Sequence, residues 1–180
     1  IFLILSRLER RKGIHLAIQA FGNVIKNHPD SLLCIVFPIG EYSYPEMLEE
    51  YFSQVSKLNI GQHVHFITGV NVKNVPLYFQ ASNFFLMSSV ELETFGLSTI
   101  EAAASGCVPI GFKSGATTEL LYKINKKLIV TSINAKSLAK KINWALSLTN
   151  LEKQKLRLQS IKMSDAYKWS KTSKSLNKLL

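Results

Sequence analysis

The stretch from Asn83 to Phe112, NFFLMSSVELETFGLSTIEAAASGCVPIGF, decides the fold class. Two short apolar runs within it, Asn83–Met87 and Val108–Phe112, are typical of buried strands. The segment between them, Ser98–Ser105, is typical of a helix. A strand, a helix and a second strand in this order predict two parallel strands joined by a right-handed crossover.

The same alternation of strands and helices runs along the rest of the chain. Further strands are predicted at Ile1–Leu5, Ser31–Phe37, His63–Ile67 and Leu128–Thr131. Further helices are predicted at Gly13–Asn27, Glu46–Leu58, Val75–Gln80, Thr117–Tyr122, 135–148 and 151–164, with a last one near the end. Because the strands are continuous apolar runs, we predict an α/β fold with a Rossmann-like, doubly wound parallel sheet.

The composition is that of one globular domain. The chain has 180 residues, of which 47% are hydrophobic and 19% charged, and its apolar runs are too short to span a bilayer. Because the chain begins with Ile1 directly in a core strand, we expect it to be a piece of a longer protein. Cys34 and Cys107 are expected to be buried, reduced thiols in a cytoplasmic setting.

The net charge of +10 is unevenly distributed. Between Leu151 and Leu180, eight Lys or Arg residues stand against only Glu152 and Asp165. This excess is typical of the solvated face of C-terminal helices, but a basic helix can also lie against the anionic cytoplasmic face of a membrane. No nucleic-acid partner is expected, because the sequence lacks an aromatic-interleaved basic motif, a zinc pattern and a recognition-helix signature.

The loops at one edge of the predicted sheet are the places to look for a site. In a doubly wound sheet, ligands bind outside the carboxyl ends of the strands. The loops that follow strands here are Ser6–Lys12, Pro38–Tyr44, Thr68–Lys73, Ser88–Leu97 and Lys113–Thr118.

The first of these loops is strongly basic. Arg7, Arg10, Arg11 and Lys12 lie between the first strand and its helix, and Gly13 permits a close backbone approach there. Cations and free backbone N–H groups at this edge suit phosphate groups. An exposed basic turn is the alternative interpretation.

The loop after the fourth strand holds three glutamates. The turn Phe95–Leu97 contains Gly96 and leads into a helix whose first N–H groups attract anions. Glu91 is interpreted as a solvated charge, whereas Glu93, next to the turn, is the better candidate to bind a ligand. Glu101 either binds a ligand or closes a capping box with Ser98, three residues earlier.

Two other patterns leave alternatives open. Gly115, Thr117 and Thr118, followed by Glu119, are consistent with the same site or with a simple turn and helix cap. Paired carboxylates also occur in glycosidases. A glutamate at a helix start beside an anion site, however, suits ligand binding better than proton donation.

Together these residues resemble the C-terminal half of a GT-B glycosyltransferase of the retaining group 1 type, glycosyltransferase family four. The family patterns G-R-L-x-x-x-K-G, E-x-F-G-[LI]-x-x-x-E-A and G-G-x-x-E are matched, in order, by SRLERRKG at 6–13, ETFGLSTIEA at 93–102 and GATTE at 115–119. Tyr167–Ser170 resembles the aromatic-tryptophan segment of the closing helix. The resemblance covers nearly the whole chain.

The resemblance implies a role for each matching residue. Arg7 and Lys12 would bind the diphosphate of a nucleotide-sugar donor, and Glu93 would accept hydrogen bonds from the transferred sugar; these three would be catalytic. The remaining donor contacts would come from Glu101 at the ribose, from the backbone of Phe95, Gly96, Leu97 and Ser98, and from Val70 near the base. No metal and no cofactor besides the donor substrate is implied.

The implied protein is the donor-binding part of a retaining glycosyltransferase that acts on an acceptor hydroxyl. Residues 1–150 would form the nucleotide-sugar-binding domain and 151–180 a helical extension. An N-terminal domain outside this chain would bind the acceptor, a saccharide or a lipid-linked saccharide, so this fragment alone is expected to be inactive. The alternatives are a non-hydrolysing nucleotide-sugar epimerase and a degenerate, non-catalytic binding module.

Three positions depart from the family pattern. Ser6 and Ala116 replace glycines of two motifs, and Phe37 stands where a glycine usually ends the strand. Each is expected to add bulk near a ligand loop, which would narrow the choice of donor or weaken its binding.

Overall fold

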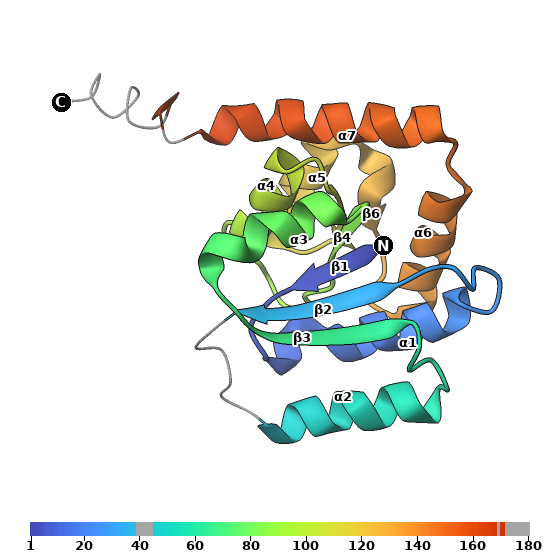
Figure 1. The fold of residues 1–180 in the computed structure, drawn as a ribbon. Helices are drawn as coiled ribbons and strands as arrows, with labels where there is room; N and C mark the ends of the chain where they lie inside the picture. The colour runs from blue at the N-terminus through green and yellow to red at the C-terminus, as the bar shows by residue number, and fades with distance from the viewer. Residues whose placement is uncertain (39–44, 169, 172–180) are drawn as a thin grey trace.

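A computed structural model describes residues 1–38, 45–168 and 170–171 of the chain. A six-stranded, wholly parallel sheet in the order β3-β2-β1-β4-β5-β6 forms its centre (Figure 1), which confirms the predicted fold class. The strands are β1 (Phe2–Leu5), β2 (Leu33–Pro38), β3 (Val64–Val70), β4 (Phe84–Met87), β5 (Val108–Phe112) and β6 (Ile129–Val130).

Helices cover both faces of this sheet. In Figure 1, α1 and α2 lie below the sheet, and α3, α4 and α7 lie above it. The α-helices are α1 (Ile14–Val24), α2 (Pro45–Lys57), α3 (Val75–Ala81), α4 (Leu97–Ala104), α5 (Gly115–Ile124), α6 (Ala135–Ser147) and α7 (Asn150–Ser164). The 3-10 helices are η1 (Arg10–Lys12), η2 (Val72–Asn74), η3 (Lys126–Leu128) and η4 (Asp165–Tyr167).

The outer helices hold the layers together. Helix α6 packs against α1, and α7 packs against α4 and α5. Residues 150–164 therefore pack on the helices that follow β4 and β5. The predicted last helix and Trp169 lie outside the described residues, as does most of the loop after β2.

The strands are buried because apolar residues point to both faces. Phe2 and Ile4 enter one core cluster together with Phe21 of α1, whereas Leu3 enters a second cluster together with Phe79 of α3. Alternate residues of one strand thus serve two cores, which explains the continuous apolar runs in the sequence.

The two cysteines are free thiols with different surroundings. Cys107 is buried, as predicted, and burial raises the pKa of its thiol to about 12. Cys34 is only half-buried, so the prediction of full burial was wrong for it. It lies beside the edge strand β3, where its register partner His65 is exposed.

Strand β3 is longer than predicted. The sequence prediction ended it at Ile67, because Thr68 and Gly69 interrupt the apolar run. Pairing with β2 continues past an irregularity in register, so that Pro38 pairs with Val70. Val70 is consequently a buried strand residue and not part of a loop.

The sheet changes its direction of winding between β1 and β4. Strands β2 and β3 follow β1 on one side, and β5 and β6 follow β4 on the other. The loop after β1 and the loop after β4 are bound together at this point. The backbone N–H of Val90 donates to the carbonyl oxygen of Arg11 (2.8 Å), and the Ser88 hydroxyl donates to the carbonyl oxygen of Lys12 (2.8 Å).

Gly13 makes this contact possible. Its backbone is left-handed (φ +64°), and a Cβ at this position would lie 2.0 Å from the carbonyl oxygen of Ser88. No residue with a side chain fits there unless the two loops move apart.

We therefore expect Gly13→Ala to lower the free energy of unfolding by about 2 kcal/mol or more, from backbone strain and the clash with Ser88. The matched control is Gly61→Ala, because a Cβ on Gly61 meets no atom within 4 Å. Urea unfolding followed by circular dichroism measures both variants. Equal stability of the two would contradict the role given to Gly13.

Candidate functional site

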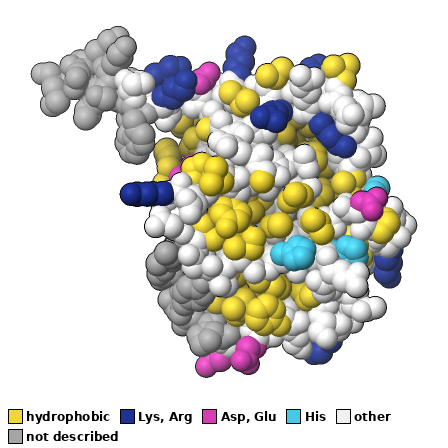
Figure 2. Space-filling model, viewed as in Figure 1, with side chains coloured by type: hydrophobic (Ala, Val, Ile, Leu, Met, Phe, Trp, Pro, Cys, Tyr) yellow, Lys and Arg dark blue, Asp and Glu magenta, His cyan; other side chains and the backbone are white. Residues whose placement is uncertain are grey.

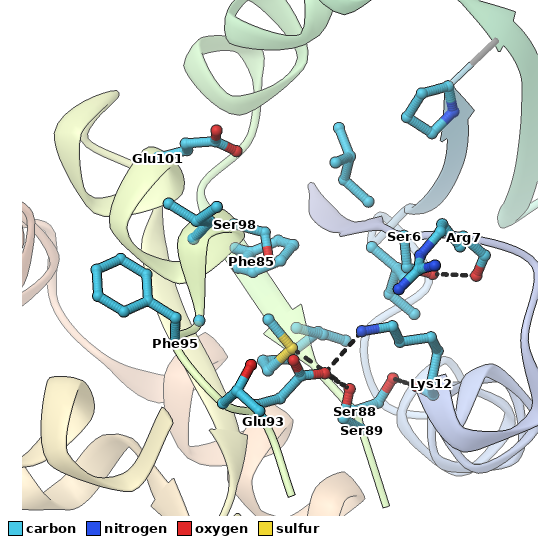
Figure 3. A pocket seen from close by; sticks show the side chains of 18 residues that line it. Ser6, Arg7, Lys12, Phe85, Ser88, Ser89, Glu93, Phe95, Ser98 and Glu101 are labelled. Carbon is cyan, nitrogen blue, oxygen red and sulfur yellow. Dashed lines mark hydrogen bonds and ion pairs between the residues drawn. The ribbon is translucent and has the colours of Figure 1, made fainter. Parts of the chain in front are cut away.

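A pocket of about 360 Å³ opens at the carboxyl edge of the sheet, where β1 and β4 lie side by side (Figure 3). Its lining includes every predicted donor-site residue except Val70. These are Arg7, Lys12, Glu93, Phe95, Gly96, Leu97, Ser98 and Glu101.

The pocket has an apolar floor and a polar rim. Strand residues such as Leu5 and Phe85 form the floor, while the loops that follow β1 and β4 supply the rim. In Figure 3, Arg7 and Lys12 lie on one side of the opening, and Ser98 and Glu101 lie on the other. The cavity is therefore bordered by cations on one wall and by a helix start with a carboxylate on the opposite wall.

An ion pair joins the two loops at the base of the pocket. The ammonium of Lys12 donates to Oε1 of Glu93 over 2.7 Å, and each side chain is only 13% exposed. The guanidinium of Arg11 lies 4.0 Å from the same oxygen, and the hydroxyl of Ser89 also donates to it. Glu93 is thus held by three groups from two loops.

These contacts set the ionisation of Glu93. Burial by itself would raise the pKa of this carboxyl, but the hydrogen bonds from Lys12 and Ser89 and the charges of Lys12 and Arg11 outweigh it. The pKa of Glu93 consequently lies below its ordinary value. A carboxyl in this state is an acceptor of hydrogen bonds and a poor proton donor.

Two serines at the end of β4 were missed in the sequence. Ser88 joins the two loops, Ser89 orients Glu93, and both side chains are 2% exposed. The signal that could have revealed them is a pair of hydroxyl residues directly after an apolar strand, where parallel sheets present their ligand sites.

Glu101 is not part of a capping box. Helix α4 begins at Leu97, one residue earlier than predicted, and its N-cap is Gly96 in a left-handed conformation (φ +75°) with no side-chain cap. Ser98 therefore lies inside the first turn. The side chain of Glu101 stays at the pocket rim, where partial loss of hydration raises its pKa.

The first turn of α4 faces the pocket with open backbone donors. The first N–H groups of this helix to donate to the carbonyl of Gly96 are those of Thr99 and Ile100. The N–H groups of Leu97 and Ser98 precede them and have no partner within the helix. Such a turn attracts anionic groups through its free donors and its dipole.

Phe95 projects from the rim beside this turn. Its side chain is 54% exposed, and its ring meets that of Tyr167 edge-on at a centroid distance of 6.4 Å. Tyr167 also accepts a hydrogen bond from Lys123. The segment after α7 therefore supports one wall of the pocket.

The loop Lys113–Thr118 contacts the backbone of Glu93 but does not line the pocket. A Cβ on Gly115 would lie 2.3 Å from the carbonyl oxygen of Glu93, and the N–H of Ala116 donates to that oxygen (2.9 Å). Thr117 is fully buried inside α5, whose N-cap is Ser114. The motif thus fixes the backbone of Glu93.

The basic loop divides into two pairs. Arg7 and Lys12 line the pocket, whereas Arg10 pairs with Glu50 of α2 (2.5 Å). Arg11 pairs with Glu9 (2.5 Å), which also contacts Arg7 over 3.0 Å. Glu9 therefore contributes to holding Arg7 beside the opening.

The remaining predicted residues are placed as follows. Glu91 has an exposed side chain, as predicted, while its carbonyl accepts a hydrogen bond from Ser114. The side chain of Val70 is buried in the second core cluster and does not line the pocket. Ser6 lines the pocket, as expected from its place in the motif.

The expectation for Phe37 was wrong. Its ring is 1% exposed and packs in the core cluster that contains Ile35. Residues two apart on a strand point to the same face of the sheet, so the ring of Phe37 lies in the core on the same face as Ile35. It is not among the residues that line the pocket. Its bulk fills the core and does not narrow the pocket.

Comparison with known proteins agrees with this architecture. The family model described as "Glycosyl transferases group 1" matches residues 1–161. The chain belongs to this family. The C-terminal domain of a group 1 glycosyl transferase (LpcC) from Francisella tularensis has the same fold, with a TM-score of 0.81, 21% identity, and 93% of this chain and 86% of that chain covered.

Two further similar proteins are much longer than this chain. Spore coat protein SA of Bacillus subtilis is 27% identical over 179 residues, which cover 98% of this chain and 47% of that protein. Anabaena Alr3699/HepE, solved with UDP-glucose, has a TM-score of 0.77 and 21% identity, with 91% of this chain and 42% of that chain covered. The chain therefore spans less than half the length of each of these two proteins.

Two observations concern only the part of the chain that the structure describes. No group of three or more His, Cys, Asp or Glu side chains there is arranged to hold a metal ion. No helix in the same ranges has the length and apolar character needed to cross a membrane.

The Lys12–Glu93 pair predicts a pH dependence of stability. Because the pKa of Glu93 is lowered by folding, its ionised form stabilises the fold above the unfolded value of about 4.3, and this stabilisation is lost as the pH falls through the folded pKa. Lys12→Met removes the contact that does most to lower the pKa of Glu93. The pKa therefore rises, and the variant loses less free energy of unfolding at low pH than the wild type does.

Urea unfolding at pH 7 and at about pH 3.5 measures this difference. Lys26→Met, which removes an exposed lysine, is the control and should retain the wild-type dependence. An identical pH dependence in Lys12→Met and the wild type would show that the ion pair does not govern Glu93.

Proposed function

We propose that this chain is the donor-binding domain of a retaining glycosyltransferase, which transfers a sugar from a nucleoside-diphosphate sugar to an acceptor hydroxyl. One observation carries the proposal. A single pocket brings together two cations, an open helix start and two glutamates, at the point where the sheet reverses its winding. The UDP-glucose in the similar Anabaena structure supports the same class of ligand.

The cations and the helix start suit the diphosphate. Negative charge develops on the leaving nucleoside diphosphate as the sugar bond breaks. Arg7, Lys12 and the N–H groups of Leu97 and Ser98 would stabilise that charge, at about 2.7–4 kcal/mol for a well-placed donor. A fixed arrangement of this kind lowers the barrier without a protein nucleophile.

The two glutamates suit the two ends of the ligand. Glu93 stays ionised beside Lys12 and would accept hydrogen bonds from hydroxyls of the transferred sugar. Glu101, on the opposite wall, would accept them from the ribose. The base would lie toward Pro38, which lines the pocket and pairs with Val70.

The acceptor would attack on the face that the phosphate leaves, which retains the configuration of the sugar. Lys12 would transfer part of its interaction from Glu93 to the diphosphate as the donor binds. We expect the acceptor, a saccharide or a lipid-linked saccharide, to be bound largely by parts of the protein outside these 180 residues. The isolated chain would then bind donor without transferring sugar.

Calorimetric titration with UDP, GDP and ADP tests the donor site. We expect selective binding of one nucleotide, weakened about tenfold or more by Arg7→Ala and by Glu101→Gln, since each removes a charge-assisted hydrogen bond. Arg10→Ala and Glu91→Gln are matched controls, because Arg10 pairs with Glu50 and Glu91 is exposed outside the pocket.

The proposal fails if the wild-type chain binds none of the three nucleotides, or if the control variants weaken binding as much as the pocket variants. A sugar epimer formed from donor alone would indicate an epimerase. Sugar transfer by the isolated chain would contradict the expectation that it is inactive.

A further inference from the structure

One long stretch of the chain contains basic residues but no acidic ones. The 32 residues from Leu120 to Leu151 include six lysines and no Asp or Glu. The arginines of the chain all lie outside this stretch. The sequence analysis located the basic excess in 151–180, but this earlier stretch is the one that lacks any compensating acid.

The structure gathers five of these lysines on neighbouring elements. Lys126 and Lys127 are exposed on η3, and Lys136 and Lys140 are exposed on successive turns of one side of α6. Lys141 joins the two elements, because its ammonium donates to the carbonyl oxygen of Lys127. We call these five residues the lysine face.

Apolar groups accompany the lysine face. Trp144 lies one turn beyond Lys140 and is half-buried, with its ring centroid 5.1 Å from the ammonium of Lys141. Ile133, just before α6, is 45% exposed. Figure 1 shows α6 on the outer flank of the fold, at the right of the view, and the exposure of Lys136 and Lys140 shows that their side of the helix is open to solvent.

The charge of the face is not neutralised within the protein. Among the described residues, none of the five lysines forms an ion pair with a carboxylate. The pKa of Glu152 is lowered mainly by its hydrogen bonds with Thr149 and to a smaller extent by the charge of Lys127, with which it forms no ion pair. An unpaired cluster of this kind attracts an external polyanion.

We propose that the lysine face docks on an anionic lipid bilayer, with Trp144 at the level of the headgroups. Lysines are compact charges that suit a diffuse anionic surface, whereas recognition of nucleic-acid bases and phosphates relies largely on arginine, which the face lacks. Trp144 and Ile133 supply the apolar contact that a membrane interface favours. This surface lies outside the pocket, and the inference does not rest on the proposed function.

Helix α7 provides the comparison. It also carries cations, several of which are visible along the top of Figure 2, but it has Glu152 in its first turn and Asp165 directly after its end. Lys155 and Lys162 are exposed on α7. Replacing both with neutral residues lowers the net charge by two, which is the same change that replacing two residues of the lysine face produces.

Vesicle sedimentation of the 180-residue chain tests the proposal. We expect binding to vesicles of 70% phosphatidylcholine and 30% phosphatidylglycerol, weak binding to pure phosphatidylcholine, and loss of binding at high salt. Lys136→Gln/Lys140→Gln should weaken binding about 25-fold, at about fivefold for each lysine, while Lys155→Gln/Lys162→Gln should change it little.

Fluorescence gives an independent measurement. The sequence has two tryptophans, so Trp169→Phe leaves Trp144 as the sole reporter. Brominated phosphatidylcholine in the anionic vesicles should quench its emission. Thermal melts and nucleotide titration of the lysine variants show whether the fold and the pocket are intact.

Three outcomes would overturn the proposal. The first is equal affinity of the wild type for anionic and neutral vesicles. The second is equal weakening by the α6 and α7 double variants, which would mean that net charge alone governs binding. The third is tighter binding of a single-stranded RNA that depends on Lys136 and Lys140, which would identify a nucleic acid as the partner.

Discussion

The close crossing of Gly13 over the carbonyl oxygen of Ser88 is the constraint on which the site depends. It binds the loop after β1 to the loop after β4, two segments more than seventy residues apart, at the point where the sheet reverses its winding. This crossing brings Lys12 next to Glu93. Gly115 adds a second close approach, to the backbone of Glu93, so the main chain that carries the carboxylate is held by close packing.

The electrostatics of the pocket follow from this geometry. Lys12, Arg11 and Ser89 all act on one carboxylate oxygen, which keeps Glu93 ionised despite its burial. Lys12 and Glu93 neutralise each other's charge across the 2.7 Å ion pair. A ligand with phosphates beside hydroxyls can offer each of them a new partner, since the phosphates attract Lys12 and the hydroxyls donate to Glu93.

The sequence alone predicts the strands and most of the residues that line the pocket. Doubly buried strands appear as continuous apolar runs, and their carboxyl ends locate Arg7, Lys12 and Glu93. Other features depend on geometry that the sequence does not display. The S-x-x-E pattern at Ser98 is typical of a cap, yet the left-handed Gly96 begins the helix one residue earlier. Val70 follows the predicted end of its strand, and only its pairing with Pro38 shows that it belongs to the sheet.

In the proposed function, Lys12 exchanges Glu93 for the diphosphate of the ligand. The most direct test is the pKa of the Glu93 carboxyl, measured by NMR with and without the nucleoside diphosphate that binds. We expect the pKa to rise on binding, because Lys12 turns toward the phosphates and a new anion lies nearby. An unchanged pKa in the saturated complex would contradict it, because the ion pair would then have stayed closed with the phosphates bound elsewhere.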